Sequence, residues 1–218
     1  MTQFDLMLER LHRGKNPYAG FPVDSWSGTW FGDPGAMRQI FKDSLDMVKP
    51  KIVLEVGSFV AESTIFMADH IKSRAWDCVI VMIDTWRGGV DHWLRANEKI
   101  QFHFGAVDLY YKCIANVIQR GHQDIILPLT LDSLNAARLL KAMDIRPDYL
   151  YLDASHEEGD VGRDMEAYWD LLPSGGGMLI DDISGHFPGV VADWHRFEKA
   201  HNLTAALVEG EKVFVIKP

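Results

Sequence analysis

From about residue 37 onward, short apolar runs alternate with longer segments whose apolar residues recur at helical spacing. A short apolar run bounded by turn residues is typical of a buried strand, and the helical spacing is typical of an amphipathic helix. Their alternation predicts an α/β domain built on a doubly wound, mostly parallel sheet. We expect strands at 52–56, 79–83, 125–127, 149–152 and 178–180, and helices at 37–48, 61–71, 133–143, 159–172 and 190–201.

Two further regions complete this predicted domain. Residues 91–120 are expected to be mostly helical, in two pieces separated near Gly105. Residues 204–208 and 212–216 are alternating runs joined by Glu209-Gly210-Glu211, which predicts a hairpin. The pattern therefore predicts a Rossmann-like, seven-stranded sheet over residues 36–218, mostly parallel with a C-terminal antiparallel hairpin.

The first 35 residues form a separate segment, with several aromatic side chains among glycines and prolines and little periodicity. We expect this segment to be a lid over the substrate or an N-terminal extension. Packing on the core or on a second subunit is left open by the sequence.

Composition narrows the class of protein. The 218-residue chain is 47% hydrophobic and 24% charged, which fits one globular domain. Its longest apolar runs, such as 78–83, are too short to cross a bilayer, and its N-terminus lacks the features of a signal peptide. We therefore expect a cytoplasmic protein that does not bind membranes. A net charge of −9 argues against nucleic-acid binding and favours a small-molecule partner, while a homo-oligomer is left open.

Three acids follow two of the predicted strands. Asp153 comes directly after strand 149–152, and Asp181 and Asp182 come directly after strand 178–180. Ligands of open parallel sheets bind at the carboxyl ends of the strands, and oxygen ligands at this density suit Mg²⁺ or a similar cation. Because adjacent strand residues point to opposite faces, Asp181 and Asp182 can both bind only if the chain bends there. If it does not bend, one of them is structural.

The first predicted strand leads into a turn of small residues around Gly57, at a position typical of a ligand-binding turn. A pyrophosphate-binding turn requires a second glycine where this chain has Phe59, which disfavours a dinucleotide. Asp84, after the second strand, is placed to accept hydrogen bonds from the hydroxyls of a ribose. Glu55 either holds the turn or contacts an ammonium group of the ligand.

These features together resemble the class I S-adenosylmethionine-dependent methyltransferases over about residues 37–218. The motifs that carry the resemblance are Glu55-x-Gly57-x-x-x-Ala61, Asp84, Asp132-Ser133 and the closing hairpin. The later acids resemble those of metal-dependent small-molecule O-methyltransferases of the catechol and macrolide-sugar types, and of related bacterial proteins including cephalosporin-hydroxylase-like ones. Those motifs are Leu152-Asp153-Ala154-Ser155-His156-Glu157, Gly175-Gly176 and Asp181-Asp182.

The resemblance implies a cofactor and a set of site residues. S-adenosyl-L-methionine is expected to contact Glu55, Gly57, Ser58, Ser63, Asp84, Thr85, Trp86, Asp132, Ser133 and Asp153. A helix N-cap accounts equally well for Asp132 or Ser133. Mg²⁺ or a similar cation is expected at Asp153, Asp181 and Asp182.

The resemblance also implies a catalytic pair, Asp153 and His156. His156 follows Asp153 at the offset where catechol-type enzymes place a catalytic lysine, so it is the expected general base, with His186 as the alternative. The expected function is metal-assisted transfer of a methyl group from S-adenosylmethionine to a hydroxyl of a small molecule. Two alternatives are a methyltransferase-like protein with changed chemistry and an NAD(P)-dependent oxidoreductase, against which Phe59 argues.

Overall fold

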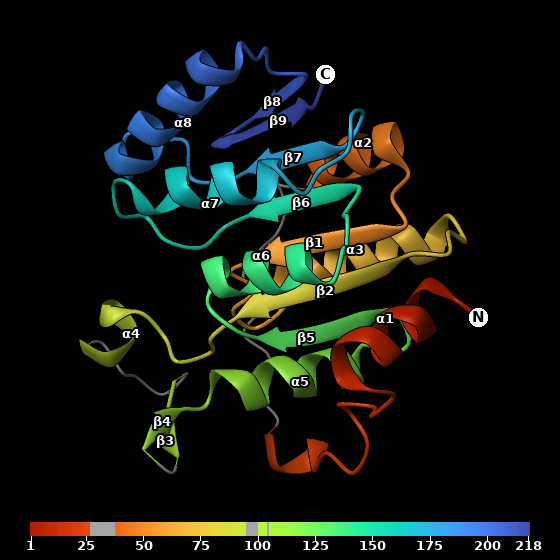
Figure 1. The fold of residues 1–218 in the computed structure, drawn as a ribbon. Helices are drawn as coiled ribbons and strands as arrows, with labels where there is room; N and C mark the ends of the chain where they lie inside the picture. The colour runs from red at the N-terminus through yellow and green to blue at the C-terminus, as the bar shows by residue number, and fades with distance from the viewer. Residues whose placement is uncertain (27–37, 95–99, 104) are drawn as a thin grey trace.

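The computed structural model describes residues 1–26, 38–94, 100–103 and 105–218. A single central sheet runs through the molecule, with helices on both faces (Figure 1). Its seven strands lie in the order β5-β2-β1-β6-β7-β9-β8. They are β1 Ile52–Val56, β2 Val79–Asp84, β5 Ile126–Thr130, β6 Tyr149–Leu152, β7 Gly177–Ile180, β8 Leu207–Glu209 and β9 Lys212–Ile216. The first five strands in this order, β5, β2, β1, β6 and β7, are parallel to one another. Strand β9 is antiparallel to both of its neighbours, β7 and β8, which confirms the predicted fold class.

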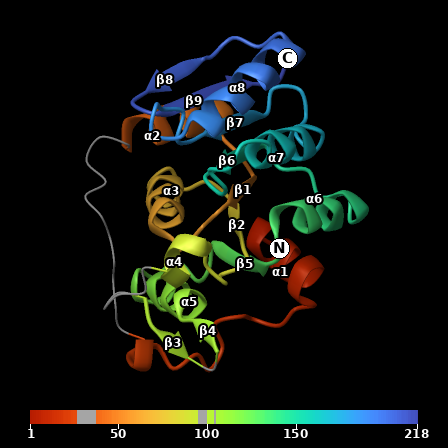
Figure 2. The same ribbon diagram turned by 90° about the vertical axis from the view of Figure 1, so that its left-hand side faces the viewer.

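The helices divide into two layers, one on each face of the sheet (Figure 2). Successive strand residues face opposite layers: Val53 packs with one apolar cluster, and Leu54 with the other. The layer that receives Val53 contains α2 Arg38–Val48, α3 Glu62–Ser73 and α5 Leu109–Gln119. The layer that receives Leu54 contains α1 Gln3–His12, α6 Ser133–Ala142, α7 Asp160–Trp169 and α8 Pro188–His201. Among the described residues, no helix has the length and apolar character needed to cross a membrane.

Helix α1 was not predicted from the sequence. A capping box in which Thr2 and Asp5 bond each other's backbone N–H groups starts the helix, and Met7 is buried in the core. Tyr18 fixes the following segment, because its hydroxyl donates to the carbonyl of Ile126 at 2.8 Å. The described part of the N-terminal segment therefore packs on the core, while residues 27–37 lie outside the described residues.

The region between β2 and α5 differs from the prediction of two helices. A short helix, α4 Val90–Leu94, is followed by a small hairpin of β3 Phe102–His103 and β4 Ala106–Val107. Gly105 has a φ of 79°, a left-handed conformation that suits a hairpin turn and not a helix. The prediction of helix is therefore wrong at β3 and β4, whereas the predicted break near Gly105 and the helix at α5 are confirmed. Residues 95–99 and 104 lie outside the described residues.

Candidate active site

The register of the parallel strands brings the sequence-predicted acids to one edge of the sheet. Val56 of β1 pairs with Ile83 of β2 and with Leu152 of β6, and Leu152 pairs with Ile180 of β7. The residue that follows each of these four paired positions therefore emerges at the ligand-binding edge of the sheet. These residues are Gly57, Asp84, Asp153 and Asp181.

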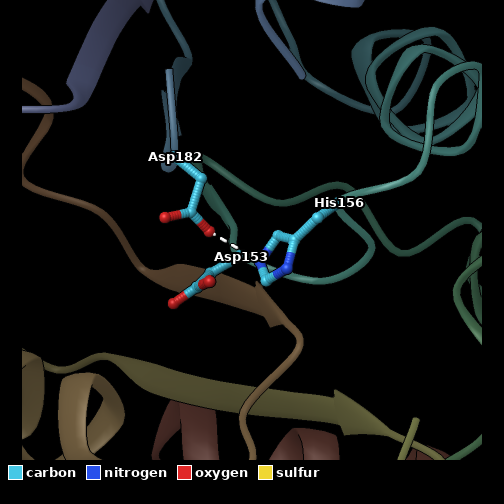
Figure 3. Close-up of side chains that lie close together, drawn as sticks. All are labelled: Asp153, His156 and Asp182. Atoms are coloured by element: carbon cyan, nitrogen blue, oxygen red, sulfur yellow. Dashed lines mark ion pairs between the residues drawn. The ribbon is translucent and has the colours of Figure 1, made fainter. Parts of the chain in front are cut away.

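Three side chains at this edge converge on one another (Figure 3). Asp153, His156 and Asp182 each offer a ligand atom, and these atoms lie within 4.8 Å of one another. The Nε2 atom of His156 is 2.7 Å from Oδ2 of Asp182, and the imidazole packs against Phe187 with ring centroids 4.2 Å apart. A hollow beside the three residues is lined by segment 152–156, by α7 and α8 and by the two acids after β7.

The electrostatics of this group favour a bound cation. Burial, together with the charges of Asp181 and Asp182, raises the pKa of Asp153 to about 7. The hydrogen bond to Asp182 raises the pKa of His156 above its usual value, although burial opposes the shift. Asp182 is therefore the main group that raises the pKa of His156. Two carboxylates and an imidazole are a donor set that fits a divalent metal ion.

Asp181 lies outside this group of three. One of its oxygens accepts a hydrogen bond from Tyr151 at 2.5 Å and forms an ion pair with the buried Lys212, and the other accepts from the backbone N–H of Asp182 at 2.8 Å. The left-handed φ of Asp182, 61°, shows that the chain bends between the two consecutive acids. Neither Tyr151 nor Lys212 was predicted from the sequence to belong to the site. The one signal in the sequence was the charged Lys212 at the start of the second run of the predicted hairpin.

The turn after β1 lies directly against the end of β6. Gly57 has a φ of 90°, and a Cβ atom added there would lie 1.8 Å from the carbonyl oxygen of Asp153, so only glycine fits. Asp84 accepts hydrogen bonds from the backbone N–H groups of Phe59, at 2.9 Å, and Trp86, at 2.7 Å. The Trp86 indole donates to the carbonyl of Phe59 at 2.7 Å. Phe59, which replaces the glycine of a pyrophosphate turn, is thus held from both sides.

Glu55 is fully buried beneath this turn. Its two carboxylate oxygens accept hydrogen bonds from the hydroxyls of Ser63 and Thr64 in the first turn of α3. Burial raises the pKa of Glu55 to about 7, and these hydrogen bonds oppose the rise. Of the two roles left open by the sequence, these contacts are those of a residue that supports the turn. Ser58 is also buried, with its hydroxyl 3.5 Å from the carbonyl of Glu55.

The remaining sequence-predicted residues lie farther along the edge. Asp132 is the N-cap of α6 and accepts from the backbone N–H of Asn135 at 3.0 Å, so the capping role is confirmed for this residue. The carbonyl of Ser133 accepts from the Tyr168 hydroxyl at 2.8 Å. The Thr85 hydroxyl accepts from the backbone N–H of Arg87 at 3.2 Å. His186 is exposed and lies outside the group of Asp153, His156 and Asp182.

Comparison with known proteins identifies the family. Residues 54–183, more than half of the chain, match the family model described as a methyltransferase domain. The chain belongs to this methyltransferase family. A search of the curated proteins finds no match.

The fold of this methyltransferase is shared with solved structures of low sequence identity. One is the O-methyltransferase from Bacillus cereus in complex with SAH, at 12% identity and a TM-score of 0.61, covering 99% of this chain and 98% of that one. Another is the O-methyltransferase TomG from Streptomyces achromogenes, involved in tomaymycin synthesis and solved with SAM. It is 13% identical with a TM-score of 0.61, covering 100% of this chain and 97% of that one. The predicted family and fold are thus confirmed.

Proposed function

We propose that this methyltransferase transfers a methyl group from S-adenosylmethionine to a hydroxyl oxygen of a small molecule, assisted by a divalent cation. The observation that carries the proposal is the position of Asp153. Its backbone packs against the Gly57 turn, while its side chain joins His156 and Asp182. A cofactor at the turn and a cation at the side chains would therefore be neighbours, as in-line methyl transfer requires.

Several residues at the turn suit an adenosyl group. Gly57 leaves the end of β1 without a side chain, and Asp84 is only partly buried. The carboxylate of Asp84 has lone pairs beyond those used by its two backbone partners, so it remains able to accept from ribose hydroxyls. We assign direct contact with the cofactor to Gly57, Asp84, Trp86 and Asp153. Ser58, Thr85 and Ser133 remain proposed contacts, and Glu55, Ser63 and Asp132 are assigned to support of the surrounding backbone.

The chemistry divides between the two ligands and the chain. The sulfonium of S-adenosylmethionine supplies the methyl group. A divalent cation supplies positive charge that lowers the pKa of a hydroxyl and orients its oxygen. Asp153 and Asp182 would hold that cation at the end of the sheet, next to the Gly57 turn. Asp182 also orients the imidazole of His156 through the contact at 2.7 Å. The proposal of metal-assisted transfer does not require His156 to act as the general base, because the cation itself would lower the pKa of the substrate hydroxyl.

The proposal is tested by binding and by turnover. Isothermal titration should show micromolar binding of S-adenosylmethionine or S-adenosylhomocysteine. Incubation with methyl-labelled cofactor, Mg²⁺ or Mn²⁺ and a panel of catechols, flavonoids and sugars should then yield a labelled product. Failure of both nucleosides to bind would overturn the proposal, and binding of NAD(P) in their place would favour the oxidoreductase alternative. Nucleoside binding without transfer to any member of the panel would favour the cofactor-binding alternative.

A further inference from the structure

We infer that the cation is held by one imidazole and two carboxylates, those of His156, Asp153 and Asp182, and that Asp181 is not a ligand because Lys212 retains it. The inference rests on the proposed function, whose metal site it specifies. It replaces the three-acid site expected from the sequence with a mixed nitrogen and oxygen site.

The spacing of the three side chains suits a shared ion. Ligand atoms bound to one six-coordinate ion at about 2.1 Å are about 3 Å apart when adjacent and about 4.2 Å apart when opposite. The candidate atoms of Asp153, His156 and Asp182 lie within 4.8 Å of one another, so small side-chain rotations would bring them onto one ion. His156 extends from the loop after β6 toward the two acids at the strand ends (Figure 3).

The surroundings of Asp181 explain why it is not available to the ion. Its side chain lies between the Tyr151 hydroxyl and the ammonium of Lys212, which is 3% exposed. Drawing Asp181 toward the ion would leave a buried ammonium without its partner, a change that is strongly unfavourable in proteins. Asp182, which follows in a left-handed conformation, has no such partner among the described residues and places its carboxylate 2.7 Å from the Nε2 atom of His156.

A nitrogen ligand changes which metal ion the site is expected to prefer. It also changes the role expected for His156. Oxygen-only sites suit Mg²⁺, Ca²⁺ or Mn²⁺, whereas imidazole suits later first-row ions, and the affinity of a given site rises from Mn²⁺ through Fe²⁺ and Co²⁺ to Ni²⁺. The site is therefore expected to bind Co²⁺ more tightly than Mn²⁺ or Mg²⁺. A ring nitrogen that binds the ion cannot accept the proton of the substrate, so in this arrangement His156 is a ligand and not the general base.

Pulsed electron paramagnetic resonance of the Mn²⁺-loaded protein tests the imidazole ligand without reference to turnover. The spectrum should show modulation from a directly bound ¹⁴N nucleus. His156→Gln should abolish the modulation and weaken Mn²⁺ binding at least about tenfold, and the matched control His186→Gln should change neither. Mn²⁺ bound without nitrogen modulation, or modulation that survives in His156→Gln, would overturn the inference while leaving the proposed function intact. Absence of stoichiometric Mn²⁺ binding would overturn both.

Calorimetric titration with Mn²⁺ tests the exclusion of Asp181. Asp153→Asn should weaken binding at least about tenfold, whereas Asp181→Asn should keep the affinity within a few-fold. Because Asp181→Asn leaves Lys212 unpaired and can impair folding, the double variant Asp181→Asn/Lys212→Met removes both charges of the buried pair. This double variant should also keep the affinity within a few-fold. A loss as large as that of Asp153→Asn in the double variant would show that Asp181 is a ligand.

Discussion

At the scale of single residues, Glu55 shows how burial adapts a carboxyl group to support a turn. The folded protein binds its proton more tightly than the unfolded chain does, because burial raises its pKa from 4.5 to about 7. The stability that Glu55 contributes is therefore fully present below pH 4.5 and is lost as the pH rises through about 7. The turn that carries Gly57 is thus supported by a group whose charge opposes folding at neutral pH.

Glu55→Gln should remove this dependence on pH. Between pH 4.5 and 7 the free energy of unfolding of the wild-type protein should fall by about 3 kcal/mol through Glu55 alone. The glutamine variant keeps the shape of the side chain but has no proton to lose, so its unfolding free energy should fall less over the same range. Urea unfolding at a series of pH values measures the difference. Equal slopes for the two proteins would contradict the assignment.

Other residues show which parts of the site the sequence could predict. Asp153 and Asp182 directly follow predicted strands, so their meeting at one edge of the sheet could be anticipated from the chain alone. His156 was expected as a general base, and its contact with Asp182 was not anticipated. The partner of Asp181 could not, because Lys212 reaches it only through the antiparallel pairing of Ile180 with Val213. From the sequence, the two consecutive acids could both bind an ion only if the chain bends there. The chain does bend at Asp182, and it is the ion pair with Lys212 that engages Asp181.

At the scale of elements, the turn after β1 and the end of β6 depend on each other. The side chain missing at Gly57 makes room for the carbonyl of Asp153. A larger residue at position 57 would therefore displace both the proposed nucleoside turn and the first proposed metal ligand. The strands and helices around this contact were largely predictable, because their apolar periods are regular. α1 and the β3–β4 hairpin were missed because their signals are a short capping box and a single glycine turn.

Gly57→Ala tests this dependence, with Gly121→Ala as the matched control. Both glycines have a left-handed φ, 90° and 72°, but a Cβ at Gly121 would meet nothing within 4 Å. The control should lose about 1 to 2 kcal/mol of stability from backbone strain alone. Gly57→Ala should lose at least about 1 to 3 kcal/mol more from overpacking, together with its affinity for S-adenosylhomocysteine. Thermal and chemical unfolding measure the first effect, and calorimetry the second. Equal losses in the two variants would show that the close contact is unimportant.

At the scale of the whole molecule, one edge of the sheet gathers acids from strands that are far apart in the sequence. β1, β6 and β7 lie next to one another, so Gly57, Asp153 and Asp182 meet although more than a hundred residues separate the first from the last. Two layers of helices bury both faces of this sheet and leave its carboxyl edge for ligands (Figure 2). A ligand bound there to the folded state alone should stabilise the whole domain.

Binding of a divalent cation should therefore raise the free energy of unfolding. With Mn²⁺ at 100 times its dissociation constant, the gain over protein in excess EDTA should be about 2.7 kcal/mol. Urea unfolding in the two buffers measures this gain. Asp153→Asn should show a much smaller gain at the same Mn²⁺ concentration. A wild-type protein that unfolds identically with Mn²⁺ and with EDTA would contradict a metal site in the folded domain.

The most direct test of a shared site for nucleoside and cation is a crystal structure with S-adenosylhomocysteine and Mn²⁺, using the anomalous scattering of manganese. We predict a manganese peak between Asp153, His156 and Asp182, with the nucleoside against the Gly57 turn and its ribose at Asp84. A nucleoside bound elsewhere, or side chains at 153 and 182 without a manganese peak between them, would contradict the account.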